Sequence, residues 1–361
     1  EAVSLLRPRL RRASQTAFQP ASLCDKTSGI RHPHGHEMIV VRTQCLNVWR
    51  NLAVEEALLD RFSAEAQPLL FLWRSAHAVV IGKNQNPWRE ANIPLMNDDG
   101  CALARRISGG GAVYHDEGNL NYTFIVDRRH YKGSRVFAVV LAALHTLGFH
   151  AARMGRTSIG VDGRKVSGNA FCLRRGAALH HGTLLVSSDR ARMGRYLRSG
   201  TSAIRSRAIA SQPAETVNLR ELQPDIGIGN VEAALVQSAA AEFGAMAESR
   251  GDDWLEAVVR KDDCGRMASW DWLYGQTPSF ELDIERTLAG LSARLYANVT
   301  DGRIGEARAT LRDPSSGVVA LESRLQGVRF DVAEIAERLR PVAAALQEGL
   351  EYALARAFVT A

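Results

Sequence analysis

Residues 104–124 read ARRISGGGAVYHDEGNLNYTF, in which two arginines precede three consecutive glycines and a strand-like segment follows. Adjacent glycines leave the backbone almost unconstrained, which opposes folding unless another group must approach that backbone closely. In the following segment Asn119, Asn121 and Thr123 alternate with large apolar residues. This period of two predicts a β-strand with one face of small polar side chains, which suits a polar ligand site built on a sheet.

The glycine-rich segment matches neither of two common nucleotide loops, because it has no Walker A motif and no GxGxxG sequence that opens a helix. Glycines between two strand-like segments let backbone N–H groups approach a phosphate or a carboxylate. The guanidinium groups of Arg105 and Arg106 would add charge and match phosphate oxygens. The alternative is a flexible hairpin loop with two solvated arginines, and the segment alone leaves both open.

The remaining pattern up to about residue 190 mixes strands and helices without a regular βαβ repeat. Strands are expected within 38–48, 68–75, 77–85, 101–108, 118–126, 158–171 and 180–188, and helices within 47–62, 86–100 and 135–151. A turn at Ser75-Ala76 would join two of the strands, and Asp162-Gly163 is a strong hairpin signal. The period of two then places Lys165, Ser167 and Asn169 on one strand face. The pattern predicts an α+β fold with a mixed sheet flanked by helices.

The C-terminal part has a different pattern and predicts a small α+β accessory domain. Residues 280–313 predict strands with a hairpin turn at Asp301-Gly302, and residues 331–358 predict two helices. Asp331 with Glu334 is a capping signal for the first helix, and Pro341 is expected to open the second. The expected division is a leader over 1–37, a catalytic domain over 38–247, a charged linker over 248–274 and the accessory domain over 275–361.

Composition restricts the class of partner. The 361 residues carry a formal net charge of +6, which favours an anionic partner without choosing among nucleotide, acidic protein and nucleic acid. Without a basic-aromatic repeat a nucleic-acid partner is disfavoured, and no apolar run has the length of a membrane helix, so we expect neither. Five dispersed cysteines without a C-x-x-C pair suggest free thiols in a reducing compartment.

The first 37 residues are rich in arginine, contain serines and carry few acids. This composition is typical of an organelle transit peptide, and a disordered basic tail is the alternative. The histidines at 32, 34 and 36 alternate, but no cysteine or carboxylate motif completes a zinc site around them. We therefore expect no metal-ligating residues there.

Four further side chains are candidates for chemistry. Lys165 follows a tight turn and has small neighbours, which would leave room for a ligand beside a cation. His180 and His181 offer acid-base groups or simply close a strand. Cys172 precedes two arginines, but an inert thiol is favoured over a nucleophile.

Four segments taken together, RRISGGGAVYHDEGNLNYTF, GRKVSGNAF, HHGTLL and SWDWLYGQTPSF, closely resemble the lipoate–protein ligase and lipoyltransferase family. They occur in the family's order and spacing, and the resemblance runs from about residue 38 to the C-terminus. It implies the fold of biotin and lipoate ligases, with the small C-terminal domain of the two-domain members.

The resemblance implies a two-step acyl transfer. Lipoate and ATP would form lipoyl-adenylate (lipoyl-AMP), with Mg²⁺ expected to assist, and the lysine of an apo lipoyl domain or of the glycine cleavage H-protein would then attack it. This reaction needs no protein nucleophile, so catalysis would consist of positioning and electrostatic stabilisation. With the basic leader, the resemblance to organellar transferases implies the mitochondrial matrix, with the cytoplasm as the alternative.

The resemblance also assigns roles to residues. Lys165 matches the lysine that contacts the acyl carbonyl and the phosphate, which makes it the catalytic residue. The other expected contacts of the nucleotide and acyl chain are Arg106, Gly109, Gly110, Gly111, Ala112, Val113, Tyr114, His181 and Thr183. Leu72, Val79 and Ile81 are expected, from strand position only, to line the apolar pocket of the acyl chain.

Several alternatives stay open. One hypothesis is that the chain performs both steps, and the other is that it only transfers a lipoyl group from preformed lipoyl-adenylate. It transfers an octanoyl or biotinyl group on the same scaffold, and a thiolate-dependent octanoyl enzyme would need a reactive cysteine. In a different class, it is a non-catalytic adenylate-binding protein that acylates no acceptor.

Overall fold

The computed structural model describes residues 37–63, 66–197, 203–288, 291–313, 317–320, 322–343 and 350–359. The predicted leader, with its three histidines, lies outside these ranges except for Glu37. Within the described ranges no helix is long and apolar enough to cross a membrane. The four described cysteines are free thiols, as expected from their dispersed positions.

A mixed sheet of eight strands, in the order β12-β1-β2-β6-β10-β9-β8-β7, organises the first part of the chain. Its strands are β1 (Met38–Arg42), β2 (Leu69–Trp73), β6 (Asn119–Asp127), β7 (Ala151–Met154), β8 (Ser158–Val161), β9 (Arg164–Leu173), β10 (Ala177–Leu185) and β12 (Met246–Arg250). β1 runs parallel to both of its neighbours, and the other pairs are antiparallel. The predicted mixed sheet is confirmed, although β12 was not expected from the sequence.

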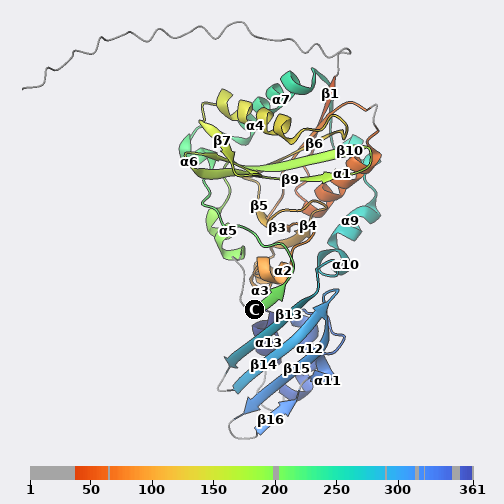
Figure 1. Ribbon diagram of the computed structural model, residues 1–361, viewed down its shortest axis with the longest axis vertical. Coiled ribbons are helices and arrows are strands. Elements are labelled where there is room, and N and C mark those ends of the chain that lie inside the picture. Colours follow the sequence, from red (N-terminus) through yellow and green to blue (C-terminus); the bar gives the residue numbers. More distant parts are fainter. Residues whose placement is uncertain are drawn as a thin grey trace, which may run out of the picture. The chain divides into compact units, whose positions relative to one another are not determined.

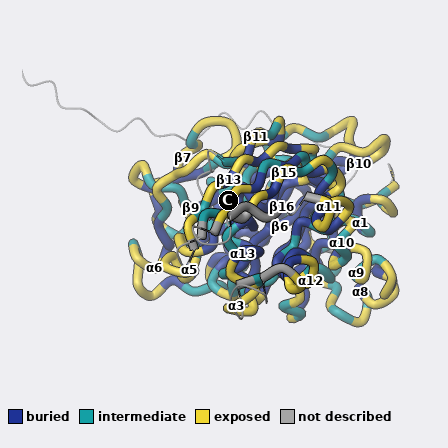
Figure 2. Tube along the Cα trace, turned by 90° about the horizontal axis from the view of Figure 1, so that it is seen from below, coloured by how far each residue is buried: buried dark blue, intermediate teal, exposed yellow. Residues whose placement is uncertain are grey.

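The two faces of this sheet are covered differently (Figure 1). Helices α4 (Gly133–Thr146) and α7 (Ile228–Phe243) pack on the face that carries Leu120, Tyr122 and Phe124 of β6. Helix α1 (Val48–Arg61) packs on the other face. All residues of β6 are buried, and Figure 2 shows this strand among dark blue segments. The predicted alternation in β6 is therefore confirmed, and its polar side faces away from α4 and α7.

A second sheet of three strands carries the glycine-rich loop. β3 (Ala78–Ile81) lies in its middle, parallel to β4 (Ala102–Arg105) and antiparallel to β5 (Val113–His115). The loop leaves β4 and enters β5, so it must cross the end of β3. The two strands expected within 68–75 and 77–85 form as β2 and β3, and they enter different sheets and do not pair.

The single helix expected within 86–100 is wrong, because two short helices form there. They are α2 (Pro87–Glu90) and α3 (Ile93–Asp98). Each has a proline in its first turn, and between them Ala91 is extended and forms a bridge with Leu197. A proline starts a helix readily but cannot continue one, which accounts for the break before Pro94.

The C-terminal part forms a five-stranded sheet in the order β11-β13-β14-β15-β16. Its strands are β11 (Ile204–Ser206), β13 (Phe280–Leu288), β14 (Leu291–Thr300), β15 (Arg303–Asp313) and β16 (Gly317–Ala320), with helices α11 (Glu322–Leu325), α12 (Val332–Ala343) and α13 (Leu350–Val359). The hairpin at Asp301-Gly302 is confirmed, since both residues have positive φ. Asp331 caps α12 by accepting from the backbone N–H of Ala333, but Pro341 lies inside α12 and does not open a helix. The helical pattern of α12 outweighs the backbone hydrogen bond lost so close to its end.

The segment that precedes this sheet is helical. It contains α8 (Asp252–Val258), α9 (Lys261–Ala268) and α10 (Trp270–Leu273); the remaining helices are α5 (Arg190–Tyr196) and α6 (Leu219–Leu222). Leu255, Val258 and Met267 are buried in the same cluster as the apolar face of α1. The domain division at residues 247 and 275 stays a prediction.

Arg105, the last residue of β4, is completely buried and connects β4 to the segment that leads into β13. Its Nε and Nη2 atoms donate to the carbonyl oxygen of Leu273, at 3.0 and 2.5 Å, and Nη2 also donates to Thr277 Oγ1 at 2.9 Å. Its Nη1 atom donates to the carbonyl oxygens of Lys83 and Gln85, each at 2.9 Å. Burial lowers the pKa of Arg105 to about 10, so the residue stays charged at neutral pH.

Arg105→Met is expected to lower the free energy of unfolding by about 2–4 kcal/mol, because several buried carbonyl oxygens lose their donors. Urea unfolding followed by tryptophan fluorescence measures this loss. The matched control is Arg308→Met, since Arg308 is an exposed residue of β15. Equal stability of the two variants would contradict the role given to Arg105.

Candidate active site

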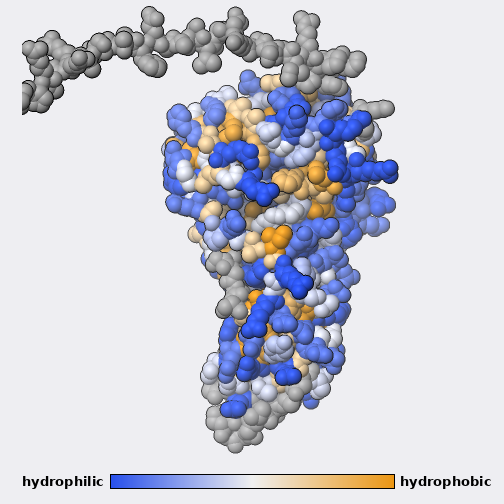
Figure 3. Space-filling view, viewed as in Figure 1, coloured by the Kyte–Doolittle hydropathy of each residue, from blue (hydrophilic) through white to orange (hydrophobic). Residues whose placement is uncertain are grey.

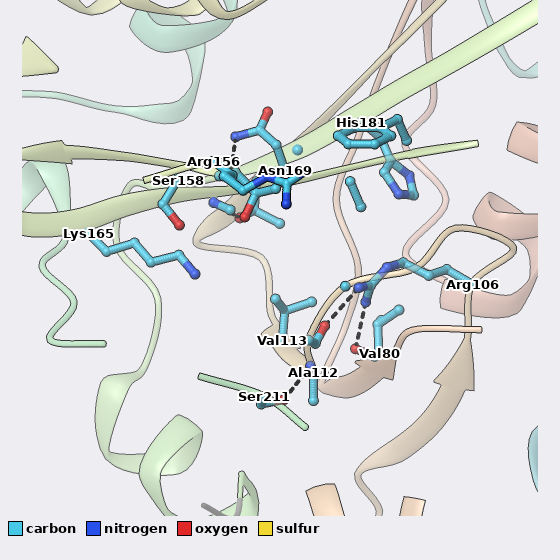
Figure 4. A pocket seen from close by; sticks show the side chains of 18 of the residues that line it. Val80, Arg106, Ala112, Val113, Arg156, Ser158, Lys165, Asn169, His181 and Ser211 are labelled. Carbon is cyan, nitrogen blue, oxygen red and sulfur yellow. Dashed lines mark hydrogen bonds between the residues drawn. The ribbon is translucent and has the colours of Figure 1, made fainter. Parts of the chain in front are cut away.

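A cavity of about 1160 Å³ is lined by residues of the eight-stranded sheet, of the three-stranded sheet and of the segment 209–214. Figure 4 shows the side chains of Lys165, Arg106 and His181 around one space. The described lining residues include four cations, Arg106, Arg153, Arg156 and Lys165, and a single carboxylate, Glu55. The cavity is therefore suited to an anionic ligand.

Arg106 is buried in the wall of this cavity and holds the glycine-rich loop. Its Nη2 atom donates to the carbonyl oxygens of Gly109 at 2.6 Å and Gly111 at 2.8 Å, and its Nη1 atom donates to that of Val80 at 3.2 Å. Burial lowers its pKa to about 10, so it keeps its charge at neutral pH. The flexible loop with solvated arginines, left open by the sequence, is excluded because both arginines are buried.

The three glycines of the loop are not equivalent. Gly110 has φ +89°, and a Cβ atom there would lie 2.9 Å from Arg106 Nη2. A Cβ atom on Gly82, at the end of β3, would lie 2.3 Å from the carbonyl oxygen of Gly110. Gly111 has the side chain of Ser211 beside it, whereas nothing lies within 4 Å of a Cβ atom on Gly109. What comes close to this backbone is thus the chain itself, at Gly82 and Gly110.

Lys165 lies at a register shift in β9. Gly160 of β8 pairs with Lys165 while Ile159 pairs with Ser167, so Val166 is an extra residue. A Cβ atom on Gly168 would lie 3.3 Å from both Cε and Nζ of Lys165, which shows that the lysine side chain lies over Gly168. The prediction that Lys165 shares a face with Ser167 and Asn169 is wrong, because a bulge shifts the alternation by one residue.

Ser167 and Asn169 bond with Tyr122, on the side of the sheet that α4 and α7 cover, although Asn169 also lines the cavity. The hydroxyl of Tyr122 donates to Asn169 Oδ1 at 2.5 Å and lies 3.4 Å from Ser167 Oγ. The side chain of Lys165 lines the cavity, and no ion pair joins it to a carboxylate of the described residues. Burial, together with the charge of Arg106, lowers the pKa of Lys165.

A buried network connects α1 to the glycine-rich loop. Nδ1 of His181 lies 2.9 Å from Glu55 Oε2, and Nε2 of His181 lies 2.6 Å from Ser108 Oγ. Ser108 Oγ also accepts from Arg106 Nε at 3.1 Å, and Glu55 accepts from Thr123 Oγ1. The carboxylate fixes the tautomer of His181, which then orients Ser108. Ser108 is not among the cavity-lining residues, so the network supports the loop and offers no exposed nucleophile.

Most of the residues predicted for the site meet at this cavity. Its lining includes Arg106, Gly110, Gly111, Ala112, Val113, Lys165, His181 and Thr183. Gly109 and Tyr114 do not line it, and the hydroxyl of Tyr114 lies 2.8 Å from His77 Nδ1 on the far side of β5. Whether these residues contact a nucleotide stays a prediction.

The three residues expected to line the acyl pocket, Leu72, Val79 and Ile81, do not line this cavity. Val79 and Ile81 point into the cluster shared with the C-terminal sheet, and Leu72 packs on the side of α4 and α7. Their neighbours Val80 and Trp73 line the cavity instead. Adjacent strand residues face opposite sides, so a choice one position away selects the wrong face.

Sequence reasoning also assigned no role to Glu55 and His115. Glu55 occupies a position on the apolar face of α1, where a carboxylate is unusual, and that position was the available signal. Burial lowers the pKa of His115 to about 3, so its ring is neutral at ordinary pH.

A magnesium site formed by the protein alone does not fit this cavity. Among the described residues no group of three or more His, Cys, Asp or Glu side chains could hold a metal ion. Glu55 already bonds His181 and Thr123. Because Mg²⁺ prefers carboxylate and phosphate oxygens, it would depend here on the phosphates of a nucleotide.

Gly110→Ala is expected to destabilise the protein by about 1–3 kcal/mol, since alanine is strained at this φ and would displace Arg106. Gly109→Ala is the matched control, with open space at its Cβ position. Thermal unfolding of the two variants measures the difference. Similar melting temperatures would show that the Gly110–Arg106 contact does not constrain the loop.

The sequence and the fold were compared with those of known proteins. Residues 47–240 match the family model of the lipoyl protein ligase A/B catalytic domain. The structure of P. falciparum LipL1 in complex with lipoate is 25% identical, with a TM-score of 0.58 over 90% of this chain and 99% of that chain.

Two further structures are similar over a smaller share of the chain. A bipartite lipoate protein ligase from Thermoplasma acidophilum, described with its E2 lipoyl domain, is 23% identical with a TM-score of 0.58, over 66% of this chain and 96% of that chain. A lipoate-protein ligase A bound with ATP is 24% identical with a TM-score of 0.57, over 66% and 98%. Since the family model matches more than half of the sequence, this chain belongs to the lipoyl protein ligase A/B catalytic domain family.

Proposed function

We propose that this protein attaches lipoate to a specific lysine of an acceptor protein, through lipoyl-adenylate formed from lipoate and ATP. The observation that carries the proposal is the ammonium group of Lys165, which lies in a cationic cavity without a carboxylate partner among the described residues. A half-buried cation without a partner is unfavourable, and an anionic ligand would remove that cost. Related structures bound to lipoate and to ATP support this choice of ligands.

In this proposal the glycine-rich loop, Arg106 and Lys165 have different roles. The glycine-rich loop, held by Arg106, lines the cavity with backbone at Gly110 and Gly111. Lys165 would contact the acyl phosphate and stabilise the negative charge that develops as an acceptor amine attacks the carbonyl carbon. The activation step releases pyrophosphate from ATP. In the transfer step the neutral amine forms the amide bond, the C–O bond to AMP breaks and AMP leaves with that electron pair, while the amine gives up its proton to solvent. The acceptor's nucleophile is its own lysine, so positioning and electrostatics suffice.

The cavity does not favour a route through a cysteine thioester. No cysteine is among its described lining residues. Cys172 of β9 lies outside it, and burial raises the pKa of this thiol although Arg174 and Lys83 lie near it. Alkylation of the cysteines is therefore expected to leave acyl transfer intact.

The acceptor must reach Lys165 from the cavity mouth. Phe171, Leu173 and Ile209 line the cavity and are each about half exposed, at 46%, 47% and 49%. The molecular face drawn in Figure 3 also has hydrophobic side chains among hydrophilic ones. The structure of a relative with its E2 lipoyl domain supports a lipoyl domain as acceptor, and the H-protein is the second candidate.

The decisive experiment incubates the pure protein with an apo lipoyl domain and measures the intact mass of the acceptor. Lipoate with ATP is expected to add one lipoyl group. Transfer only from synthetic lipoyl-adenylate would identify a transferase that lacks the activation step. No mass change with either donor would contradict the proposal and favour a non-catalytic adenylate-binding protein.

Lys165→Ala is expected to lower transfer from lipoyl-adenylate by about 10²–10³-fold, as loss of one group that stabilises transition-state charge does. Circular dichroism should remain unchanged. Lys261→Ala is the control, since Lys261 is exposed at the start of α9. Near-normal turnover in the Lys165 variant would exclude the assigned role.

Binding of an anion should also depend on pH through Lys165. Its pKa in the empty cavity is lowered from 10.5, and a bound adenylate should raise it again, so binding takes up protons in the alkaline range. Affinity for lipoyl-adenylate is therefore expected to fall as the pH rises through the lowered pKa. Calorimetry at neutral and alkaline pH measures this, and Lys165→Met should remove most of the dependence.

A further inference from the structure

Two polar side chains in the cavity wall have hydrogen-bonding atoms without partners. His115 and Asn121 are each 3% exposed and both line the cavity. Neither ring nitrogen of His115 has a partner among the described residues, and the same is true of Asn121 Nδ2. Buried polar atoms are nearly always paired, so two such residues facing one cavity indicate that a ligand or water completes them.

Asn121 lies two strands away from β9, the strand that carries Lys165, and His115 lies beside Trp73, one strand further. Asn121 of β6 pairs with Trp73 of β2 on one side and with Thr183 of β10 on the other. The ring centroids of Trp73 and His115 are 5.6 Å apart. Since Lys165 is on β9, three strand spacings, or about 14 Å, separate its strand from that of Trp73. An acyl chain whose carbonyl lies at Lys165 must therefore cross β10 and β6 before its far end reaches Trp73.

Most polar groups near Trp73 already have hydrogen-bond partners within the protein. Trp73 Nε1 donates to Glu55 Oε1 at 3.3 Å, and Glu55 also bonds His181. Among the described residues, the Asn121 amide Nδ2 and the neutral ring of His115 have no partner, and the His115 ring lies beside the indole ring of Trp73. Donors of this kind suit a weak acceptor, and an aromatic ring suits sulfur.

A saturated alkyl end would fit this environment poorly. In the empty cavity, water can occupy a polar space of this size and pair with both residues. An alkyl end displaces that water and leaves the donors unpaired, which weakens binding. A ring with two sulfur atoms offers acceptors to the donors and contacts the indole.

We propose that His115 and Asn121 select the far end of the acyl chain and favour a cyclic disulfide over a saturated alkyl end. This inference rests on the proposed function, because it takes the far end of the cavity to hold the acyl chain. It adds the preference for a lipoyl over an octanoyl group and the residues that set it.

The test compares the dissociation constants of synthetic lipoyl-adenylate and octanoyl-adenylate for the full chain by calorimetry. The wild-type protein is expected to bind the lipoyl compound about tenfold more tightly, the size of effect that one unpaired buried donor produces. Asn121→Leu and His115→Leu should each bring the ratio of the two constants close to one, mainly through tighter octanoyl binding. If Asn121→Leu fails to fold, Asn121→Val replaces it.

The chain offers a matched control in Asn119. This residue lies two positions before Asn121 on the same strand face, is fully buried, and has both amide atoms without partners, but it does not line the cavity. Asn119→Leu should leave the ratio unchanged. The inference is overturned if the wild-type ratio is near one, if both variants keep the wild-type ratio, or if Asn119→Leu changes it equally. An adenylate with an 8-hydroxyoctanoyl chain that binds more tightly than the lipoyl compound would also overturn it.

Binding and transfer separate this inference from the proposed function. If the wild-type protein prefers lipoyl-adenylate but acylates no acceptor, the selectivity stands and the proposed function fails. If it transfers lipoyl and octanoyl groups equally well and binds both adenylates equally, the proposed function stands and the selectivity fails.

Discussion

Two consecutive buried arginines determine how this protein is assembled around its cavity. Arg105 and Arg106 have exposures of 0% and 6%, and both satisfy their donors mainly with backbone carbonyl oxygens. A buried guanidinium group requires such acceptors at fixed positions. The backbone conformations at 82–85, 109–111 and 273–277 therefore depend on these two side chains. Because neighbouring strand residues point in opposite directions, the end of β4 connects the loop and the C-terminal part at once.

This arrangement separates charge from hydrogen bonding. The N–H groups of Arg106 are largely used by the loop, yet its positive charge still acts on the cavity, where it helps to lower the pKa of Lys165. Lys165 lies at a bulge, and its backbone N–H donates to the carbonyl oxygen of Glu215 at 2.8 Å. One cation thus provides structure and long-range charge, while the other keeps its donors for a ligand. An electrostatic role in catalysis requires this kind of fixed orientation before the ligand arrives.

Local patterns predicted the strand faces well wherever no irregularity intervened. The alternation in β6 and both glycine-containing hairpins could be read from short segments, because turn chemistry and the period of two act over a few residues. The bulge at Val166 could not be foreseen, since it depends on pairing of Lys165 with a segment some 50 residues later. That shift explains why Lys165 was placed beside Ser167 when it lies over Gly168. The choice of Val79 in place of Val80 failed for a related reason: alternation does not reveal which face will be covered.

The cavity residues also differ in how far the sequence could predict them. Arg106 and Lys165 belong to recognisable motifs, whereas Glu55 and Trp73 lie outside them and meet the motif residues only after folding. The unpaired state of His115 and Asn121 is a property of the folded wall, and no sequence pattern records it.

β11 belongs to the C-terminal sheet, where it pairs with β13, although it precedes β12 of the eight-stranded sheet in the sequence. Residues 204–206 leave the first part of the sequence, join the C-terminal sheet through Ile204–Leu282 and its neighbours, and the chain then returns to complete the eight-stranded sheet with β12. The polypeptide therefore passes between the two sheets three times. A genetic cut near residue 275 removes the partner of β11 and leaves the buried Ile204 beside an open edge. A single cut therefore cannot separate the C-terminal sheet from the first part of this chain without exposing β11.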